Sequence, residues 1–254
     1  MKKTFIIISI FFLAISLFAQ DSYFYGAFSS NGKTLPYRYL EPQNIKENKK
    51  YPVVLFLHGA GERGTDNEAQ LLHCSGQFLN PEIREKYPAY VFFPQAPLGA
   101  FWSIPDCLTE LSQAMFADVN EPSWQIQMIK EMVDSIAQLP NVDFQRIYIM
   151  GISMGAMATY ELCWRYPHLF AAAVPICGGA DTNRLSNAAQ IPWRIYHGDA
   201  DPVVPVTFSR TAYRILKNAG AKIVYREFAG CTHNSWNPAF NDSDLFPWLF
   251  KQKK

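Results

Sequence analysis

One short segment, residues 147–162, constrains the fold of this chain more than any other. An apolar run from Ile147 to Met150 ends in Gly-Ile-Ser-Met-Gly, and a run with helical spacing begins at once. A short apolar run bounded by glycine is typical of a buried strand, and the pattern after it is typical of a helix. The chain therefore passes from strand to helix within a very tight turn, with Ser153 at its centre.

The same alternation of strand and helix extends along most of the chain. Near-continuous apolar runs suit strands that are buried on both faces, as in a parallel sheet. We expect strands at 22–30, 35–42, 51–59, 89–95, 146–151, 170–178, 193–198 and 221–228, and helices at 123–140, 153–167, 206–220 and 242–252. The first two strands are joined through Asn31-Gly32, a dipeptide typical of hairpin turns. The sequence predicts an α/β fold: a mostly parallel central sheet, helices on both faces and an N-terminal antiparallel hairpin.

A strand, then Gly-x-Ser-x-Gly, then a helix is typical of a nucleophile elbow. Gly151 and Gly155 are interpreted as positions where a Cβ would crowd the neighbouring strand or helix. The turn lifts the Ser153 hydroxyl out at the N-terminus of the helix, where the helix dipole favours negative charge. Ser153 is therefore the expected nucleophile.

A serine nucleophile needs a base, and a carboxylate that orients the base. In this arrangement the order along the chain is serine, acid, histidine. Of the five histidines, only His233 follows both candidate acids, Asp199 and Asp201. His233 also lies in a loop directly after an expected strand, so it is the expected base. The residues alone leave both acids open, with a small preference for Asp201 at the start of a turn.

An oxyanion hole needs two N–H donors. Met154, the first residue after the serine, is expected to supply one of them. The other is expected from the loop after the strand at 51–59, where Ala60 stands between two glycines. His58, at the end of that strand, is interpreted as a structural side chain that holds the loop.

The motifs HGAGERG, GISMG, HGDADPVVP and GCTHNSW lie between residues 53 and 236, and with them the chain resembles the α/β-hydrolase superfamily. More narrowly, it looks like the dienelactone-hydrolase-like and esterase D or feruloyl-esterase-like secreted serine hydrolases, which overlap the predicted peptidases. The resemblance implies that Asp201, the last residue of His-Gly-x-x-Asp, is the acid. It also implies that Ala60 is the second oxyanion donor. Ser153 replaces the cysteine of a true dienelactone hydrolase, and the chain has no room for the propeller of a prolyl oligopeptidase.

The resemblance further implies an open cleft without a long lid. Trp102 and Trp236 are expected to line its rim and to bind substrate, because flat aromatic faces suit sugars or phenolic rings. Ordinary packing is the alternative interpretation of both tryptophans. Loops after consecutive strands lie near each other in this fold, so a disulfide between Cys177 and Cys231 is a further hypothesis.

Residues 1–20 have the three parts of a secretory signal peptide: two lysines, an apolar run of about a dozen residues, and a small residue at Ala19. A membrane anchor is the alternative, but the apolar run is short for spanning a bilayer. We expect cleavage after Ala19 or Gln20, a single catalytic domain over 21–254, and a periplasmic or secreted location.

The net charge is +1, and no basic stripe indicates a nucleic-acid partner. The cysteine spacing matches no zinc pattern, and the expected chemistry needs no metal and no cofactor. We therefore predict a secreted serine carboxylesterase that removes acyl or feruloyl groups from plant-type polysaccharide or oligosaccharide through an acyl-enzyme. The alternatives are a serine peptidase acting on small peptides and an inactive hydrolase fold that binds glycan.

Overall fold

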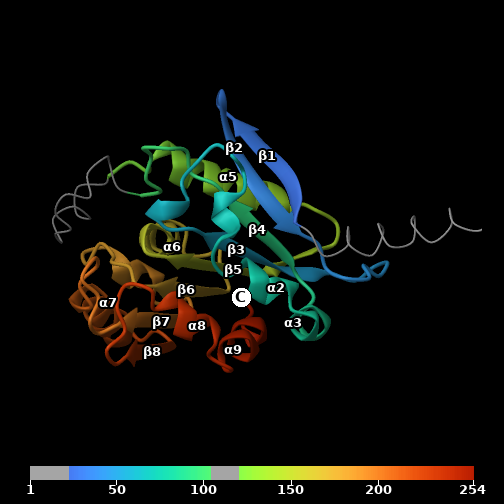
Figure 1. Ribbon diagram of the computed structural model, residues 1–254. Helices are drawn as coiled ribbons and strands as arrows, with labels where there is room; N and C mark the ends of the chain where they lie inside the picture. Colours follow the sequence, from blue (N-terminus) through green and yellow to red (C-terminus); the bar gives the residue numbers. More distant parts are fainter. Residues whose placement is uncertain (1–22, 104–119) are drawn as a thin grey trace, which may run out of the picture.

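The computed structural model describes residues 23–103 and 120–254, so the expected signal peptide lies outside the described residues. Within these ranges the strands form one sheet in the order β1-β2-β4-β3-β5-β6-β7-β8 (Figure 1). The pairs from β4 to β8 are parallel, whereas β1–β2 and β2–β4 are antiparallel. The predicted mostly parallel sheet is therefore confirmed. The strand bounds are β1 Phe24–Ser30, β2 Lys33–Leu40, β3 Tyr51–Leu57, β4 Tyr90–Pro94, β5 Val142–Ile152, β6 Ala172–Ile176, β7 Trp193–Gly198 and β8 Ile223–Phe228.

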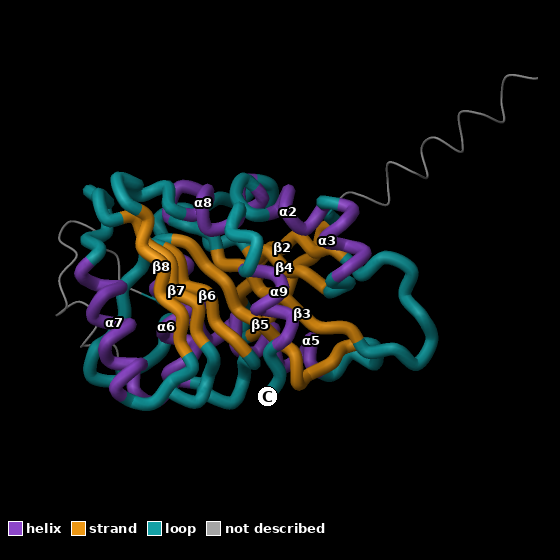
Figure 2. Tube along the Cα trace, turned by 90° about the horizontal axis from the view of Figure 1, so that it is seen from below, coloured by secondary structure: helices purple, strands orange, loops and turns teal. Residues whose placement is uncertain are grey.

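Helices cover both faces of the sheet (Figures 1 and 2). One apolar core lies between the sheet and α5, α6 and α7. A second core, on the other face, includes side chains of α2, α8 and α9. β3 contributes side chains to both cores, since Leu55 belongs to the first and Phe56 to the second. The helix bounds are α2 Ser75–Leu79, α3 Pro81–Lys86, α5 Trp124–Ala137, α6 Met154–Arg165, α7 Thr207–Asn218, α8 Trp236–Phe240 and α9 Leu245–Lys251.

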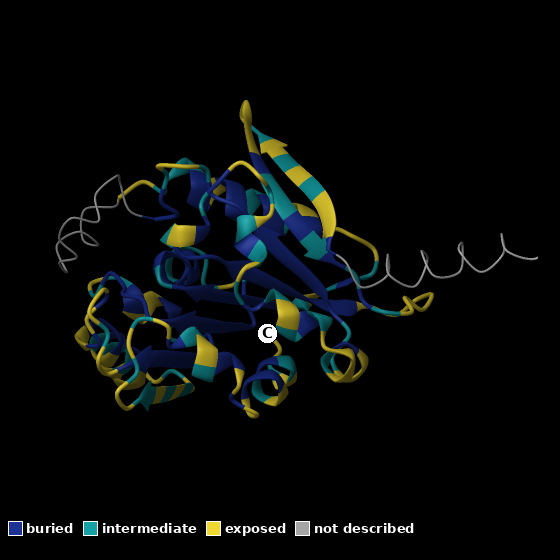
Figure 3. Cartoon of the chain, viewed as in Figure 1, coloured by how far each residue is buried: buried dark blue, intermediate teal, exposed yellow. Residues whose placement is uncertain are grey.

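The N-terminal hairpin forms where the Asn-Gly signal predicts it. Asn31 and Gly32 both have positive φ, 49° and 72°, as a tight hairpin turn with right-handed strand twist requires. In β1 exposed and partly buried residues alternate, whereas every residue of β3 is buried. Figure 3 shows this contrast between the hairpin and the dark central strands. The hairpin extends one edge of the sheet, and the parallel strands supply the fully buried centre.

Local signals also set the ends of the longer helices. The Ser123 side chain caps α5 by accepting the Ile126 N–H at 3.1 Å, and α7 is followed by Gly220 with φ +86°. The sequence pattern does not predict the short helices α2, α3 and α8, because five or six residues make too few turns to display a 3.6-residue period. Among the helices of residues 23–103 and 120–254, none combines the length and the apolar character needed to span a membrane.

Parallel strands bring the site together because their carboxyl ends meet at one edge of the sheet. β3, β5, β7 and β8 all run in the same direction. The segments that leave them at this edge carry the residues expected at the site: Ala60, Ser153, Asp201 and His233.

Candidate active site

Ser153 occupies the turn between β5 and α6 in a strained backbone conformation. Its φ is 50° and its ψ is −116°, and a residue with a side chain held there costs about 1–3 kcal/mol. The surrounding structure holds the turn, since the Ser153 N–H donates to the Ile176 carbonyl at 2.9 Å. Such strain is typical of functional sites, and here it lifts one hydroxyl out at the helix N-terminus.

The glycines on either side of Ser153 are required by close backbone contacts. A Cβ on Gly155 would lie 2.0 Å from the Leu57 carbonyl oxygen of β3. A Cβ on Gly151 would lie 2.3 Å from the Gly155 carbonyl oxygen. Real Cβ atoms do not come so close, so the predicted reason for both glycines is confirmed.

The structure brings Ser153, His233 and Asp201 together in one hydrogen-bonded line. Ser153 Oγ lies 2.9 Å from His233 Nε2, and His233 Nδ1 lies 2.7 Å from Asp201 Oδ2. The His233 side chain is 20% exposed, whereas the Asp201 side chain is completely buried. A reactant can therefore reach the serine and histidine, while the carboxylate is shielded from water.

Asp201 is held as a carboxylate by its hydrogen bonds. Burial alone would raise its pKa, but donors from His197 and His233 and from the backbone N–H groups of Val204 and Val203 outweigh this effect. The pKa of Asp201 consequently lies far below its usual range. A fixed negative charge next to His233 Nδ1 keeps the proton on Nδ1 and leaves Nε2 free to accept one.

The neighbouring acid, Asp199, has a different place in the structure. Its Oδ1 accepts the Gly230 N–H at 2.6 Å, which braces the loop that leads to His233. A Cβ on Gly198 would lie 2.2 Å from the Cys231 carbonyl oxygen, so the end of β7 packs directly against the same loop. The preference for Asp201 as the partner of His233 is therefore supported by geometry.

The two expected oxyanion donors are the first residues of helical turns near the serine. Met154 begins α6, and Ala60 begins the short 3₁₀ turn η1, Ala60–Glu62. The N–H groups of a first helical turn have no partner within their own helix. Gly59 lies against the elbow, since a Cβ built on it would be 3.6 Å from Ser153 Cβ. The structure thus places the Ala60 loop beside the nucleophile, and donation to an oxyanion stays a prediction.

His58 is a structural residue, as the sequence indicates. One ring nitrogen, Nδ1, bonds the Gly59 carbonyl at 2.6 Å, and Nε2 accepts the Ala96 N–H at 2.9 Å. Burial lowers the pKa of His58 to about 4, so the ring is neutral at neutral pH. A neutral imidazole with both ring nitrogens in hydrogen bonds fixes the start of the Ala60 loop.

The expectation that Trp102 lines the rim of the cleft is wrong. Its side chain is completely buried in the core. The indole N–H donates to the His58 carbonyl at 3.1 Å, and the two rings lie 5.1 Å apart. Trp102 therefore packs beneath the Ala60 loop, because both its polar atom and its apolar faces find partners inside the protein.

Trp236 does lie at the site. Its ring stands edge to face with His233, with centroids 5.5 Å apart, and is 4.9 Å from the ring of His73. It is only partly buried, and its contact with substrate stays a prediction. Trp236 restrains the histidine in any case, because the indole blocks one direction in which the imidazole could turn.

A carboxylate and an imidazole, Glu62 and His73, lie as a pair near the nucleophile. His73 Nε2 is 3.5 Å from Glu62 Oε1. Burial opposes ionisation of Glu62, but its bond with His73 and the charges nearby outweigh burial and lower its pKa. A Cβ on Gly59 would meet Glu62 Oε2 at 3.1 Å, so this carboxylate supports the loop that carries Ala60.

The hypothesis of a disulfide between Cys177 and Cys231 is wrong, because both are free thiols. Cys177 is buried, and its Sγ lies within 4.8 Å of ligand atoms of Asp201 and His233. Cys231 is partly exposed, and its Sγ contacts Thr232 and Asn234 instead. Burial raises the pKa of Cys177 well above its usual value, which leaves a protonated thiol and a weak metal ligand. The absence of a metal stays a prediction.

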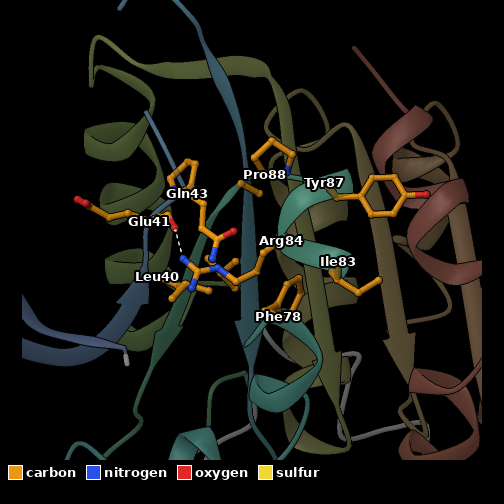
Figure 4. Close-up of a pocket in the computed structure, with 11 residues that line it drawn as sticks. Leu40, Glu41, Gln43, Phe78, Ile83, Arg84, Tyr87 and Pro88 are labelled. Atoms are coloured by element: carbon orange, nitrogen blue, oxygen red, sulfur yellow. Dashed lines mark hydrogen bonds between the residues drawn. The ribbon is translucent and has the colours of Figure 1, made fainter. Parts of the chain in front are cut away.

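Three hollows of the described surface lie away from these residues. The one in Figure 4, between Phe78, Arg84 and Tyr87, measures only about 10 Å³, about the space of one water molecule. Two wider hollows, of about 410 and 450 Å³, lie at the amino ends of the parallel strands, around Pro52 and Pro192. None of the three is lined by Ser153 or its hydrogen-bond partners.

Comparison with known proteins agrees with the geometry. The family model described as phospholipase/carboxylesterase matches residues 43–246, which is most of the chain. The chain belongs to the phospholipase/carboxylesterase family. The resemblance to the α/β-hydrolase superfamily is therefore confirmed, and with it the expected membership of a carboxylesterase family.

The similarity to individual relatives covers different shares of this chain and of the relatives. It is 33% identical to a thermostable esterase of known structure, with a TM-score of 0.85 over 92% of this chain and 64% of that one. It is 29% identical over 128 residues to poly(3-hydroxyalkanoate) depolymerase C of Paucimonas lemoignei, covering 50% of this chain and 28% of the relative. It is 27% identical over 152 residues to acetylxylan esterase A of Emericella nidulans, covering 59% of this chain and 44% of the relative. This carboxylesterase-family chain thus spans less than two thirds of each of these three relatives.

Proposed function

We propose that this protein is a serine carboxylesterase in which Ser153 is the nucleophile, His233 the general base and Asp201 the orienting acid. The observation that carries the proposal is the continuous line from Ser153 Oγ through His233 to Asp201, with steps of 2.9 Å and 2.7 Å. Both distances lie within hydrogen-bond reach, as proton transfer from a serine requires.

The reaction proceeds in two halves. Ser153 Oγ attacks the acyl carbon while its proton moves to His233 Nε2, and the alcohol leaves with that proton. Water then attacks the acyl-enzyme, His233 takes a proton from the water, and the acid is released as Ser153 regains its proton. Asp201 stays ionised throughout and stabilises the charged His233.

The negative charge that develops on the carbonyl oxygen needs donors that are already in place. The N–H groups of Met154 and Ala60 are the proposed pair, because both stand at the start of a helical turn near Ser153. The α6 dipole adds a positive field at the same point. Loss of one such donor typically costs about 100-fold to 1,000-fold in kcat.

The proposed substrate is an acylated plant-type polysaccharide or oligosaccharide, with acetyl as the first acyl group and feruloyl as the second. The similarity to acetylxylan esterase A supports this class, although it covers little more than half of this chain. Burial of Trp102 removes one of the two aromatic residues that favoured a ferulate ring. Residues 1–20 have the pattern of a signal peptide, which supports a periplasmic or secreted enzyme that meets such polymers.

The test is hydrolysis of p-nitrophenyl acetate, p-nitrophenyl octanoate, methyl ferulate and acetylated xylo-oligosaccharide side by side. Ser153→Ala serves as the matched control, because it removes one oxygen. We expect turnover of the acetyl esters by the wild type and loss of that turnover in the variant. An inactive wild type on all four esters, with cleavage of short peptides instead, supports the peptidase alternative. Binding of the oligosaccharide without cleavage supports the glycan-binding alternative.

A further inference from the structure

The carboxylate of Asp201 has a second imidazole partner besides His233. His197, the penultimate residue of β7, places Nε2 3.2 Å from Asp201 Oδ2, the same oxygen that bonds His233 Nδ1. Oδ1 accepts the backbone N–H groups of Val203 and Val204 at 2.8 and 2.9 Å. All four donors converge on one fully buried carboxylate, and His197 is itself completely buried.

The hydrogen bonds of His197 determine which ring nitrogen carries a proton. Nε2 also lies 2.9 Å from the Val204 carbonyl oxygen, which can only accept a hydrogen bond. Nε2 must therefore be protonated, and its N–H is shared between Val204 O and the ionised Asp201. On the other side, Nδ1 lies 2.7 Å from Ser209 Oγ, a hydroxyl that suits either state of that nitrogen.

His197 connects three segments at the carboxyl edge of the sheet. Its own strand, β7, leads into the turn that carries Asp201 and Val204. Ser209 belongs to α7, and its hydroxyl also lies 3.3 Å from the Gly178 carbonyl in the segment after β6. Its register neighbour on β8 is Glu227, whose charge is paired with Arg210 at 2.6 Å. The ring is thus fixed from several sides, and its Nε2–H points at the Asp201 turn.

We propose that His197 is a positioning residue for the reaction: it holds the Asp201 carboxylate in the orientation in which Oδ2 meets His233 Nδ1. The inference rests on the proposed function, since it assigns work to the Ser153–His233–Asp201 line. Without the Nε2–H, Oδ2 loses one of its two donors and the Val204 carbonyl loses this donor. The carboxylate then rotates about its two backbone bonds, and His233 is no longer aimed at Ser153.

Two neutral amides at position 197 separate this role from general packing. Glutamine places its amide nitrogen close to the position of Nε2, so His197→Gln keeps a donor for Asp201. Asparagine reaches only as far as Nδ1, so His197→Asn keeps the side facing Ser209 and leaves Asp201 without this donor. The contribution of a hydrogen bond to a charged group corresponds to at least about tenfold in an equilibrium or rate constant. We therefore expect kcat on p-nitrophenyl acetate to fall about tenfold or more in His197→Asn. We expect KM to be unchanged, and kcat of His197→Gln to stay within about threefold of wild type.

Equal losses in both variants, a change in KM alone, or no loss in His197→Asn would overturn the inference. If the wild type hydrolyses no ester, the proposed function fails instead, and that result is visible before any variant is compared. If His197→Asn does not fold, Ser209→Ala frees the ring on the Nδ1 side, and kcat should fall about fivefold at constant KM. Unchanged kcat in Ser209→Ala then overturns the inference. Nitrogen NMR of the wild type must also find the proton on Nε2, and an unprotonated Nε2 would contradict the geometry.

Discussion

Asp201→Asn removes one charge from the candidate site and replaces one carboxylate oxygen by an NH₂ group. Each oxygen of Asp201 has two hydrogen-bond partners, but the two on Oδ1 are backbone N–H groups, which can only donate, so a donor cannot occupy its place. On Oδ2, His197 keeps the Val204 carbonyl as an acceptor and His233 can change tautomer. The amide NH₂ must therefore take the place of Oδ2 and face His233 Nδ1 at about the present 2.7 Å. An N–H can only donate there, so His233 has to carry its proton on Nε2.

A proton on Nε2 disables the base, because that nitrogen then donates toward Ser153 and cannot accept its proton. A triad whose acid becomes an amide loses about 10⁴ in kcat through this wrong tautomer, which is about 5 kcal/mol of barrier. The assay is kcat/KM for p-nitrophenyl acetate from pH 6 to pH 9, with circular dichroism to verify the fold. We expect Asp201→Asn to lie about four orders of magnitude below wild type.

Asp199→Asn is the matched control, since it makes the same chemical change two residues away. The Asp199 side chain accepts the Gly230 N–H, and the amide oxygen of asparagine can accept it as well. We expect its kcat/KM to stay within about tenfold of wild type, the cost of a modest loop shift. Activity of Asp201→Asn within tenfold of wild type would refute the reasoning, and so would equal damage in the two variants.

Three further outcomes concern stability and thiol chemistry. Burial lowers the pKa of His58 to about 4 from 6.5 in the unfolded chain, so only the unfolded chain gains this proton as the pH falls between these values. Urea unfolding should therefore show a free energy of unfolding about 3 kcal/mol lower at pH 4 than at pH 7 from this group. His58→Asn should reduce this dependence of stability on pH. Gly155→Ala should cost more than about 3 kcal/mol in thermal or urea unfolding because its Cβ would lie 2.0 Å from backbone, while Gly61→Ala, with open space at its Cβ, should melt close to wild type. Iodoacetamide should alkylate Cys231 in the native protein and leave the buried Cys177 unmodified; peptide mapping that finds these two cysteines linked would contradict the structure.

The parts of the site that follow from local sequence patterns could be predicted. The elbow needs a strand, two glycines and a helix within a few residues, and each of these leaves a pattern in the sequence. His233 follows from chain order, because no other histidine comes after the acids. Asp201 needed the family resemblance, since two carboxylates two residues apart are equivalent until the direction of each side chain is known.

The environment of a side chain depends on contacts between distant segments, and these contacts cannot be predicted from local sequence patterns. The apolar loop around Trp102 is compatible with the rim of the cleft and with the core. The hydrogen bond from its indole to the His58 carbonyl, 44 residues away, places it in the core. Cys177 and Cys231 lie in neighbouring segments, but proximity of loops does not fix where the two sulfur atoms point. Chain order excludes His197 as the base, because it precedes both acids. Its spacing of four residues from Asp201 was the available signal for a supporting role.

The most direct test of the mechanism is to identify the atom that an active-site-directed fluorophosphonate modifies, by mass spectrometry of the intact protein and its peptides. The Ser153–His233–Asp201 line predicts one probe per chain, on Ser153, with labelling slowed at least about 10³-fold in His233→Ala, since an unassisted serine is a weak nucleophile. A chain that takes up no probe, or takes it up at another residue while still cleaving esters, would contradict the assignment of Ser153 as the nucleophile.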